Sequence, residues 1–315
     1  MDKTIRFTDS VDGINSLACY TWPSEGEPRG IVQLVHGMAE YMERYDGFAR
    51  FLSQNGFVVY GNDHIGHGKS AEKGTLGFMG EEQGWRYMLG DIRNVGKMAD
   101  EENPGLPRIM LGHSMGTMLA RIYIAKHGRE LAGCVLTGLV QKQKMQSISE
   151  FMCNREIKKL GPKGVSDFMV KMAFGKYNAR IPDAKSPNSW LSTDDAVVEA
   201  YDKDPLCGFP FTVSGFRDML SMSRIIFARD YYEKIPKDLP IMIAVGTEDP
   251  CGGYGKGARE EARKMKDAGA DVIYKEYSEM RHEILNEKKK AAVYDDILAF
   301  MNTTLSTRAN AEETK

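Results

Sequence analysis

The stretch "RIMLGHSMGTMLARIYIAKHG", residues 108–128, joins an apolar run to a long amphipathic run through a turn in which Ser114 stands between Gly112 and Gly116. The apolar run predicts a buried strand, and the amphipathic run predicts a helix that begins just after the serine. G-x-S-x-G is a short pattern that chance supplies easily, but this setting is the one a strained nucleophile turn requires. Glycines two residues on either side let strand and helix pass without Cβ clashes. We therefore predict Ser114 to be a nucleophile at the carboxyl edge of a sheet.

Composition excludes several classes of protein. The chain has 315 residues, 42% of them hydrophobic, and a formal charge of -2, so no basic surface for nucleic acid is expected. The five cysteines are odd in number and form no C-x-x-C pair, which argues against a disulfide framework or a zinc knuckle. The start lacks the layout of a signal peptide, and no apolar run approaches the roughly 18 residues of a membrane span. A soluble, cytoplasmic protein without a transmembrane segment is predicted, and no feature predicts an oligomeric state.

The chain shows two kinds of sequence pattern. Residues 1–142 open with a predicted antiparallel hairpin and then alternate short apolar runs with amphipathic ones, as in the βαβ units of a parallel sheet. Residues 143–232 are helix-prone and lack buried strand patterns, whereas strand and helix patterns alternate again over 233–305. We expect an α/β core formed by 1–142 and 233–305, a helical cap inserted at 143–232, and a flexible polar tail at 306–315.

Ser114 needs a general base that is oriented by an acid. Of the six histidines, three precede the serine, one lies inside its turn and one ends the following helix, which leaves His282. His282 follows the predicted strand 270–277, at the same sheet edge as Ser114. In "GTEDP" the acids Glu248 and Asp249 end another strand at that edge, and both are candidates to orient the base.

A serine nucleophile also needs donors for the oxyanion that forms on the substrate. The loop after the first core strand reads "LVHGMAEYMERY", and its residue after His36-Gly37 is Met38. The backbone N–H groups of Met38 and Met115 are the predicted oxyanion hole, each donor contributing about 3 kcal/mol of transition-state stabilisation.

Five motifs in order, "VHGMAEYMERY", "NDHIGHGKS", "GHSMG", "GTEDP" and "RHEILNE", resemble the monoacylglycerol lipase and lysophospholipase-like group of α/β-hydrolases, also described as serine aminopeptidase S33-like. The resemblance covers roughly residues 25–140 and 238–303. It implies an α/β-hydrolase fold, with a mostly parallel eight-stranded sheet, flanking helices and an inserted helical cap. It also implies Asp249 rather than Glu248 as the acid. The "HGMAEYMERY" segment implies that Glu40 and Arg44 form a buried pair bracing the oxyanion loop.

The implied activity is carboxylic ester hydrolysis of monoacylated lipids or similar esters through an acyl-enzyme. Ser114, Asp249 and His282 are the predicted catalytic residues, and a small-molecule or lipid ester is the expected partner. No cofactor or metal is predicted: Asp63, His64 and His67 could form a metal cluster, but no further residue at ligand spacing supports one. Cys251 is interpreted as a loop cysteine, with a thiol at the rim of the active site as the alternative.

Two other functions are compatible with the sequence. A proline-releasing aminopeptidase would need acids in the cap aimed at a substrate amine, for which Asp194, Asp195 and Glu199 are available. A non-catalytic small-molecule receptor on the same fold is the second alternative, and the complete triad argues against it.

Overall fold

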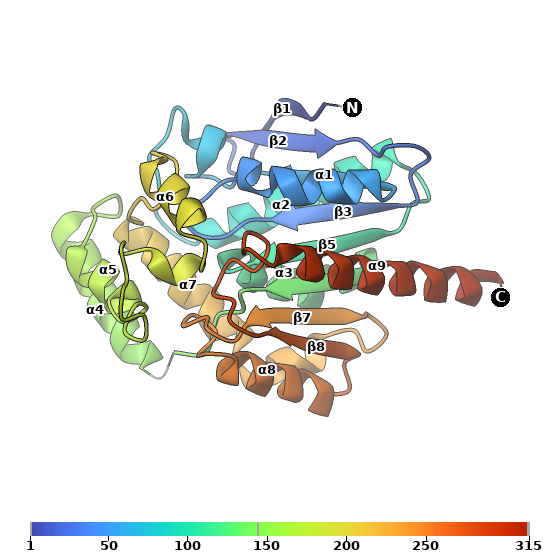
Figure 1. Cartoon of the computed structure of the whole chain (residues 1–315). Helices are drawn as coiled ribbons and strands as arrows, with labels where there is room; N and C mark the ends of the chain where they lie inside the picture. The colour runs from blue at the N-terminus through green and yellow to red at the C-terminus, as the bar shows by residue number, and fades with distance from the viewer. Residues whose placement is uncertain (1, 144, 314–315) are drawn as a thin grey trace.

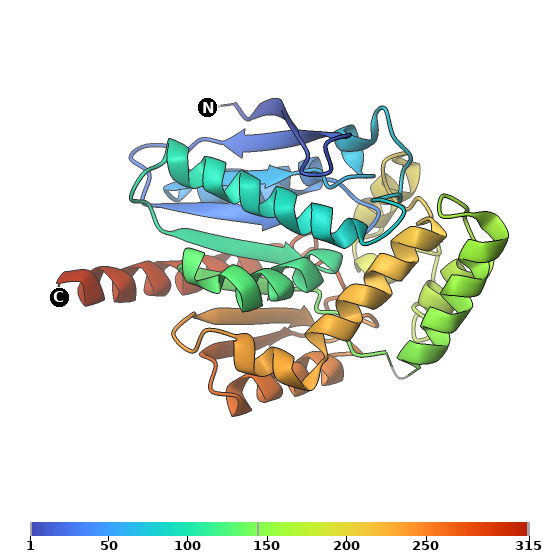
Figure 2. The ribbon, with the colours of Figure 1, turned by 180° about the vertical axis from the view of Figure 1, so that it is seen from behind.

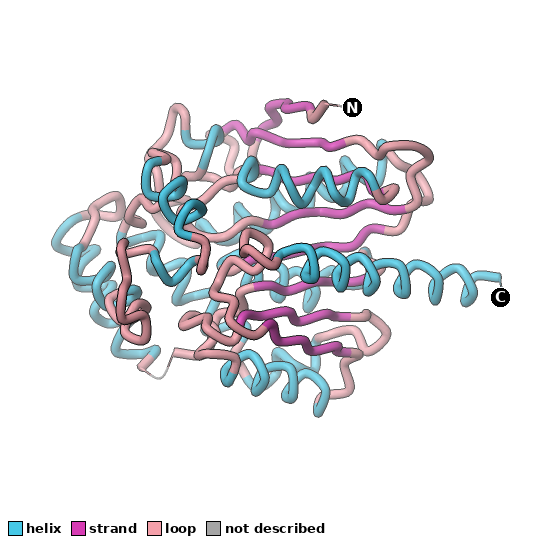
Figure 3. Tube along the Cα trace, viewed as in Figure 1, coloured by secondary structure: helices cyan, strands magenta, loops and turns pink. Residues whose placement is uncertain are grey.

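The computed structural model describes residues 2–143 and 145–313. They form one eight-stranded sheet with the strand order β1-β2-β4-β3-β5-β6-β7-β8. β1 pairs antiparallel with β2 and β2 with β4, and all other pairs are parallel. The predicted hairpin and the predicted mostly parallel sheet are thus confirmed (Figures 1 and 3). The strands are β1 (Thr4–Asp9), β2 (Ser16–Trp22), β3 (Gly30–Val35), β4 (Phe57–Asn62), β5 (Arg108–His113), β6 (Gly133–Thr137), β7 (Ile241–Gly246) and β8 (Val272–Tyr277).

Helices cover both faces of the sheet. One face carries α1 (Asp46–Gln54) and α9 (Lys290–Glu313), in front in Figure 1, and their apolar sides share one buried cluster with strand residues. The other face carries α2 (Gly84–Glu102), α3 (Met115–His127) and α8 (Lys256–Asp267), and Figure 2 shows α2 and α3 from that side. Every residue of β3 to β7 is buried because the sheet is covered twice, which explains why these strands read as continuous apolar runs.

The chain between β6 and β7 forms a helical layer over the carboxyl ends of the parallel strands (Figure 1). α7 packs on α2 and α3 of the core, and α4 packs on α7. The α-helices in the described part of this segment are α4 (Gln146–Leu160), α5 (Asp167–Phe174), α6 (Asp195–Lys203) and α7 (Val213–Ile226).

Three further observations concern the sequence predictions. α9 continues to Glu313, so the residues expected as a flexible tail from 306 onward belong, as far as they are described, to the last turns of this helix. Helix-compatible residues such as Ala309 and Ala311 follow Leu305 without a glycine or proline to stop the helix.

All five cysteines are buried and unpaired. Within the described residues, no helix combines the length and the apolar character needed to cross a bilayer.

The central position of β3 creates a crevice at the sheet edge. β3 pairs with β4 on one side and with β5 on the other. The chain leaves β3 toward β4 and leaves β5 toward β6, so the loops after β3 and β5 diverge and open a space between them. Ligands of open α/β sheets bind at such points, and here the two loops are those that carry Met38 and Ser114.

We expect Gly116→Ala to lower the free energy of unfolding by about 3 kcal/mol or more, because overpacking at a backbone contact has no room to relax. A β-carbon at Gly116 would lie 2.1 Å from the carbonyl oxygen of Val35. Gly74→Ala is the matched control, because its nearest neighbour would be 3.8 Å away. Urea unfolding measures both, and equal midpoints for the two variants would contradict the close approach of α3 to β3.

Candidate functional site

Ser114 lies in a strained turn between β5 and α3. It is the N-cap residue of α3, with φ 53° and ψ -117°, a conformation that costs a non-glycine residue about 1–3 kcal/mol. A β-carbon at Gly112 would lie 2.5 Å from the carbonyl oxygen of Gly116, so the strand and the helix cross in contact. The Ser114 N–H donates to the Thr137 carbonyl on β6 at 3.0 Å. The turn leaves Ser114 half-buried at the carboxyl edge, where the predicted nucleophile was expected.

The loop after β3 approaches this serine directly. A β-carbon at Gly37 would lie 3.1 Å from Ser114 Cβ, so Met38, the next residue, is at the nucleophile turn. His36 positions the loop: its Nε2 accepts from the His64 N–H at 3.0 Å, so Nδ1 carries the proton and donates to the Gly37 carbonyl at 2.8 Å. Met115, which opens α3, is fully buried. The structure thus brings both predicted oxyanion residues next to Ser114.

Asp249 and His282 form a buried pair. His282 Nδ1 lies 3.0 Å from Asp249 Oδ2, and because a carboxylate only accepts, Nδ1 must carry the proton. Asp249 Oδ1 accepts from the Cys251 N–H at 2.8 Å, which fixes the carboxylate. The other imidazole nitrogen of His282, Nε2, is buried and has no hydrogen-bond partner among the described residues. It is therefore free to accept a proton.

The surroundings of His282 set its basicity. Burial opposes its protonated form, but the Asp249 carboxylate outweighs burial and raises the pKa of His282 above its usual value. The ring of His113 lies 4.8 Å from that of His282, centroid to centroid, and burial together with His282 lowers the pKa of His113 to about 3. A β-carbon at Gly138 would lie 2.7 Å from His113 Cε1 and 2.9 Å from His282 Cε1. His113 is thus a neutral wall that links the Ser114 turn to the imidazole of His282.

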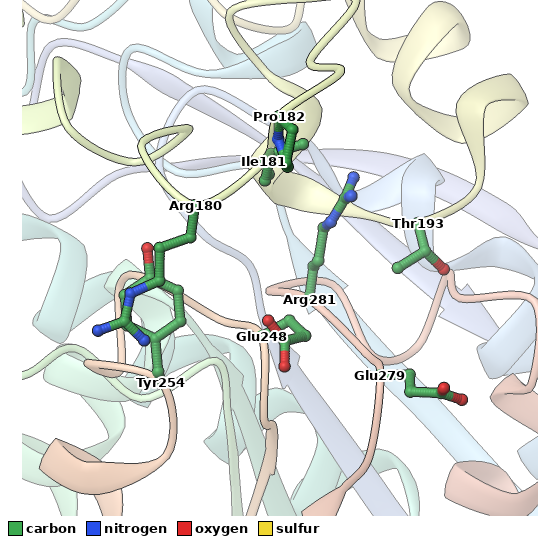
Figure 4. Close-up of a pocket in the computed structure, with 8 residues that line it drawn as sticks. All are labelled: Arg180, Ile181, Pro182, Thr193, Glu248, Tyr254, Glu279 and Arg281. Atoms are coloured by element: carbon green, nitrogen blue, oxygen red, sulfur yellow. The ribbon is translucent and has the colours of Figure 1, made fainter.

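The competing acid, Glu248, lies elsewhere. Its side chain is exposed and lines a surface pocket of about 260 Å³ (Figure 4). In that pocket the Arg180 guanidinium stacks on the Tyr254 ring at 3.8 Å, and Arg281 extends toward the cap. Of the two acids in "GTEDP", the structure brings Asp249 to His282.

One group of possible metal ligands occurs among the described residues. Asp249, Cys251 and His282 have ligand atoms within 4.8 Å of one another. The carboxylate and the imidazole already bond each other, and burial followed by the charge of Asp249 raises the pKa of the Cys251 thiol, which keeps it protonated. We therefore assign this group to the acid–base pair. Cys251 is 6% exposed and interacts with the Tyr177 side chain, so its thiol is buried.

The loop "DHIGHG", residues 63–68, has a structural role that depends on the hydrogen bonds of Asp63. Asp63 accepts hydrogen bonds from the backbone N–H groups of Met42 and Lys69, each at 2.8 Å, and from the Tyr20 hydroxyl at 2.9 Å. The ring centroids of His36 and His64 are 4.0 Å apart. The Asp63 carboxylate thus ties this loop to the segment that follows the oxyanion residues.

A buried ionic cluster joins the oxyanion loop, residues 36–45, to the loop that carries His282, residues 278–289, which we call the histidine loop. Arg44 donates to Glu40 at 2.9 Å and to both oxygens of Glu283 at 2.5 and 2.7 Å. Glu40 in turn accepts from the Gly37 N–H at 2.6 Å and from the Tyr45 hydroxyl at 2.8 Å. Burial opposes ionisation of both carboxyls: the pKa of Glu40 is raised, whereas Arg44 holds that of Glu283 below its usual value. The expected Glu40–Arg44 pair is present.

Sequence reasoning missed several members of the site. Glu283 directly follows His282, yet nothing in the pattern showed that it meets Arg44, 239 residues away. His113 was set aside as the histidine inside the serine's turn, but its ring packs on that of His282. Trp190 of the cap has its ring centroid 4.8 Å from that of His282, and the only available signal was a large aromatic residue in the cap sequence.

Known proteins resemble this chain over most of its length. Residues 26–289 match the serine aminopeptidase S33 family. The chain belongs to this family. A monoacylglycerol lipase of Mycolicibacterium smegmatis is 29% identical to this S33 chain over 312 residues, covering 96% of this chain and 99% of the relative. The human monoglyceride lipase is 26% identical over 307 residues and 90% of each chain.

Solved structures show the same fold. A thermostable carboxyl esterase from Bacillus coagulans, crystallised with glycerol, matches with a TM-score of 0.91 and 31% identity over 97% of this chain and 99% of that one. A monoglyceride lipase variant from Saccharomyces cerevisiae matches with a TM-score of 0.77 at 21% identity over 96% and 95%. The S33 chain has the α/β-hydrolase fold implied by its sequence, and it is an enzyme of the serine hydrolase class.

We expect kcat/KM to fall on the acid side through a pKa above the usual imidazole value of about 6.5, because His282 must be neutral to accept a proton. Asp249→Asn should lower kcat by about 10⁴-fold and move this acid limb to lower pH, since the carboxylate no longer stabilises the imidazolium. Ester hydrolysis measured across pH checks both. Glu248→Gln is the control and should leave the profile unchanged; the reverse ranking of the two acids would overturn the assignment.

We expect Arg44→Met to lower the free energy of unfolding by about 3 kcal/mol or more, because Glu40 and Glu283 would be left as unpaired buried acids. Thermal or denaturant unfolding measures the loss. Arg50→Ala removes an exposed ion pair with Asp46 and should leave the midpoint unchanged. Equal stability of the Arg44 variant and wild type would show that the cluster does not hold the two loops together.

Proposed function

We propose that this S33 hydrolase cleaves carboxylic esters of monoacylated lipids through a Ser114–His282–Asp249 triad and an acyl-enzyme. The observation that carries the proposal is the buried Asp249–His282 hydrogen bond, with Nε2 left free at the sheet edge where the strained turn presents Ser114. The named relatives support the substrate class, since two of them are lipases of monoacylglycerols.

The chemistry follows the geometry. His282 Nε2 takes the proton from Ser114 Oγ as the oxygen bonds to the ester carbonyl carbon, and the N–H groups of Met38 and Met115 stabilise the oxyanion. The imidazolium, held by Asp249, gives its proton to the leaving alcohol as the carbon–oxygen bond breaks. Water then loses a proton to His282 and attacks the acyl-serine, and Ser114 leaves with that proton. No step requires a cofactor.

The cap supports a substrate with an apolar chain. Met169 and Phe211 of the cap belong to the same buried apolar cluster as Met115 and Met118 of α3, and the half-buried Met38 packs against it. An acyl chain that enters between the cap and the nucleophile turn therefore meets side chains without charge. Residues 143–232 act in this proposal as the domain that selects the acyl chain, and 1–142 with 233–305 as the catalytic core.

The cap acids do not favour a peptidase. Asp194 caps α6 by accepting from the Ala196 N–H at 3.1 Å. Asp195 and Glu199 pair with Lys185 and Lys203, and their side chains are 68% and 65% exposed. None of these three carboxylates is left to bind a substrate amine in a covered site. A reducing, cytoplasmic setting is proposed because all five thiols are unpaired.

We expect wild type to hydrolyse p-nitrophenyl esters and monoacylglycerols, with lysophospholipids as a further arm, and Ser114→Ala to lose about 10⁶-fold in kcat, since the triad acts as a unit. The measurement is the rate of hydrolysis of esters with a series of acyl-chain lengths, compared with the rate on aminoacyl amides. Full activity of Ser114→Ala would overturn the mechanism. Cleavage of the amides with no ester cleavage would favour the aminopeptidase, and no cleavage of either class would favour the binding module.

A further inference from the structure

A short segment of the cap, residues 189–193, bonds the histidine loop, and we call it the strap. It begins with the 3-10 turn Ser189–Leu191 and precedes α6. Two consecutive backbone N–H groups of the histidine loop donate to it: that of His282 to the Trp190 carbonyl at 3.4 Å and that of Glu283 to the Leu191 carbonyl at 2.8 Å. The backbone N–H groups of His282 and Glu283 are therefore both bonded to the cap.

The side chain before the histidine closes this contact. Arg281 Nη1 donates to the Ser189 carbonyl at 2.7 Å and to the Ser192 carbonyl at 2.8 Å, so one guanidinium spans the strap. In Figure 4 this side chain extends from the histidine loop toward the cap. A charged donor shared by two carbonyls is stronger than a neutral hydrogen bond.

A buried carboxylate binds the other end of the same contact. Glu287 is 1% exposed, and its Oε1 accepts from the Arg281 N–H at 2.8 Å and from the Thr193 N–H at 2.9 Å. Its Oε2 accepts from the Thr193 hydroxyl. One carboxylate thus bonds both the residue before His282 and the last residue of the strap.

The strap also supplies a wall for the imidazole. Trp190 lies with its ring centroid 4.8 Å from that of His282, and Tyr177 packs on the indole at 4.7 Å. The core contributes the Asp249 hydrogen bond to the imidazole of His282, and the cap contributes the backbone partners and this aromatic wall.

We propose that the strap positions His282 as general acid and base, with Arg281 and Glu287 as positioning residues, so that the cap segment is a working part of the catalytic site rather than only its cover. This rests on the proposed function, in which His282 is the base. A loosened strap leaves Ser114 and the oxyanion residues in place but misaligns the proton transfers. Substrate must then enter through another part of the cap, while the strap stays bonded to the histidine loop.

The test compares two substrates with the same acyl chain, p-nitrophenyl octanoate and 1-octanoylglycerol. Nitrophenolate leaves without a proton, whereas the glyceroxide must receive one from His282, and general acid catalysis contributes about 10²–10⁴-fold. We expect Arg281→Ala and Glu287→Ala to lose at least about tenfold more kcat/KM on 1-octanoylglycerol than on the nitrophenyl ester. Glu287→Gln, which keeps the Oε1 acceptor, should recover most of the loss.

The control is Arg224→Ala, which removes an ion pair with Glu150 within the cap and should leave both rates unchanged. A smaller fraction of folded enzyme would reduce the rates on both substrates by the same factor. Titration with an organophosphonate, which reacts with Ser114, counts the sites that are able to react. Equal losses on both substrates, or no loss on either, overturn the positioning role even if Ser114→Ala is inactive. Activity that persists in Ser114→Ala on the same two esters overturns the proposed function instead.

Discussion

The close crossing of β5 and α3 over β3 is the constraint on which the site depends. Ser114 takes a conformation that non-glycine residues rarely adopt, because Gly112 and Gly116 let the strand and helix meet in contact with the carbonyl of Val35. The local strain is offset by the doubly covered sheet, whose central strands are buried throughout. The same crossing brings Gly37 against the serine, so one packing contact brings together the predicted nucleophile and the oxyanion loop.

Buried charge joins the loops that this crossing leaves apart. Arg44 holds Glu40 on the oxyanion side and Glu283 on the histidine side, and a charge left without its partner at this depth would be costly. In the proposed mechanism, the arrangement links the position of the developing oxyanion to that of the proton acceptor. Burying these charges costs desolvation free energy. The benefit in the proposed mechanism is that the oxyanion donors and the His282 imidazole are held in a fixed relative position.

The cap therefore has two kinds of contact with the core. Apolar packing of α7 on α2 and α3 seats it over the sheet edge, and the hydrogen-bonded strap ties it to the histidine loop. A guanidinium shared by two carbonyls adds a geometric specificity that apolar contacts lack. In the proposed function, this difference divides the cap into a part that receives the acyl chain and a part that holds His282 in position.

The sequence by itself determined the alternating strands and helices and the Ser114 turn, because periodicity and short motifs carry these. The family resemblance implied the Glu40–Arg44 pair, and elimination among the histidines made His282 the predicted base. The sequence left Glu248 and Asp249 as adjacent candidates until the resemblance favoured one, and it placed the end of α9 too early. Only the tertiary structure decided that Asp249 meets His282, that Glu283 meets Arg44, and that residues 189–193 bond the histidine loop. Such contacts join segments up to 239 residues apart, and no local pattern encodes which side chains will face each other once the sheet has formed.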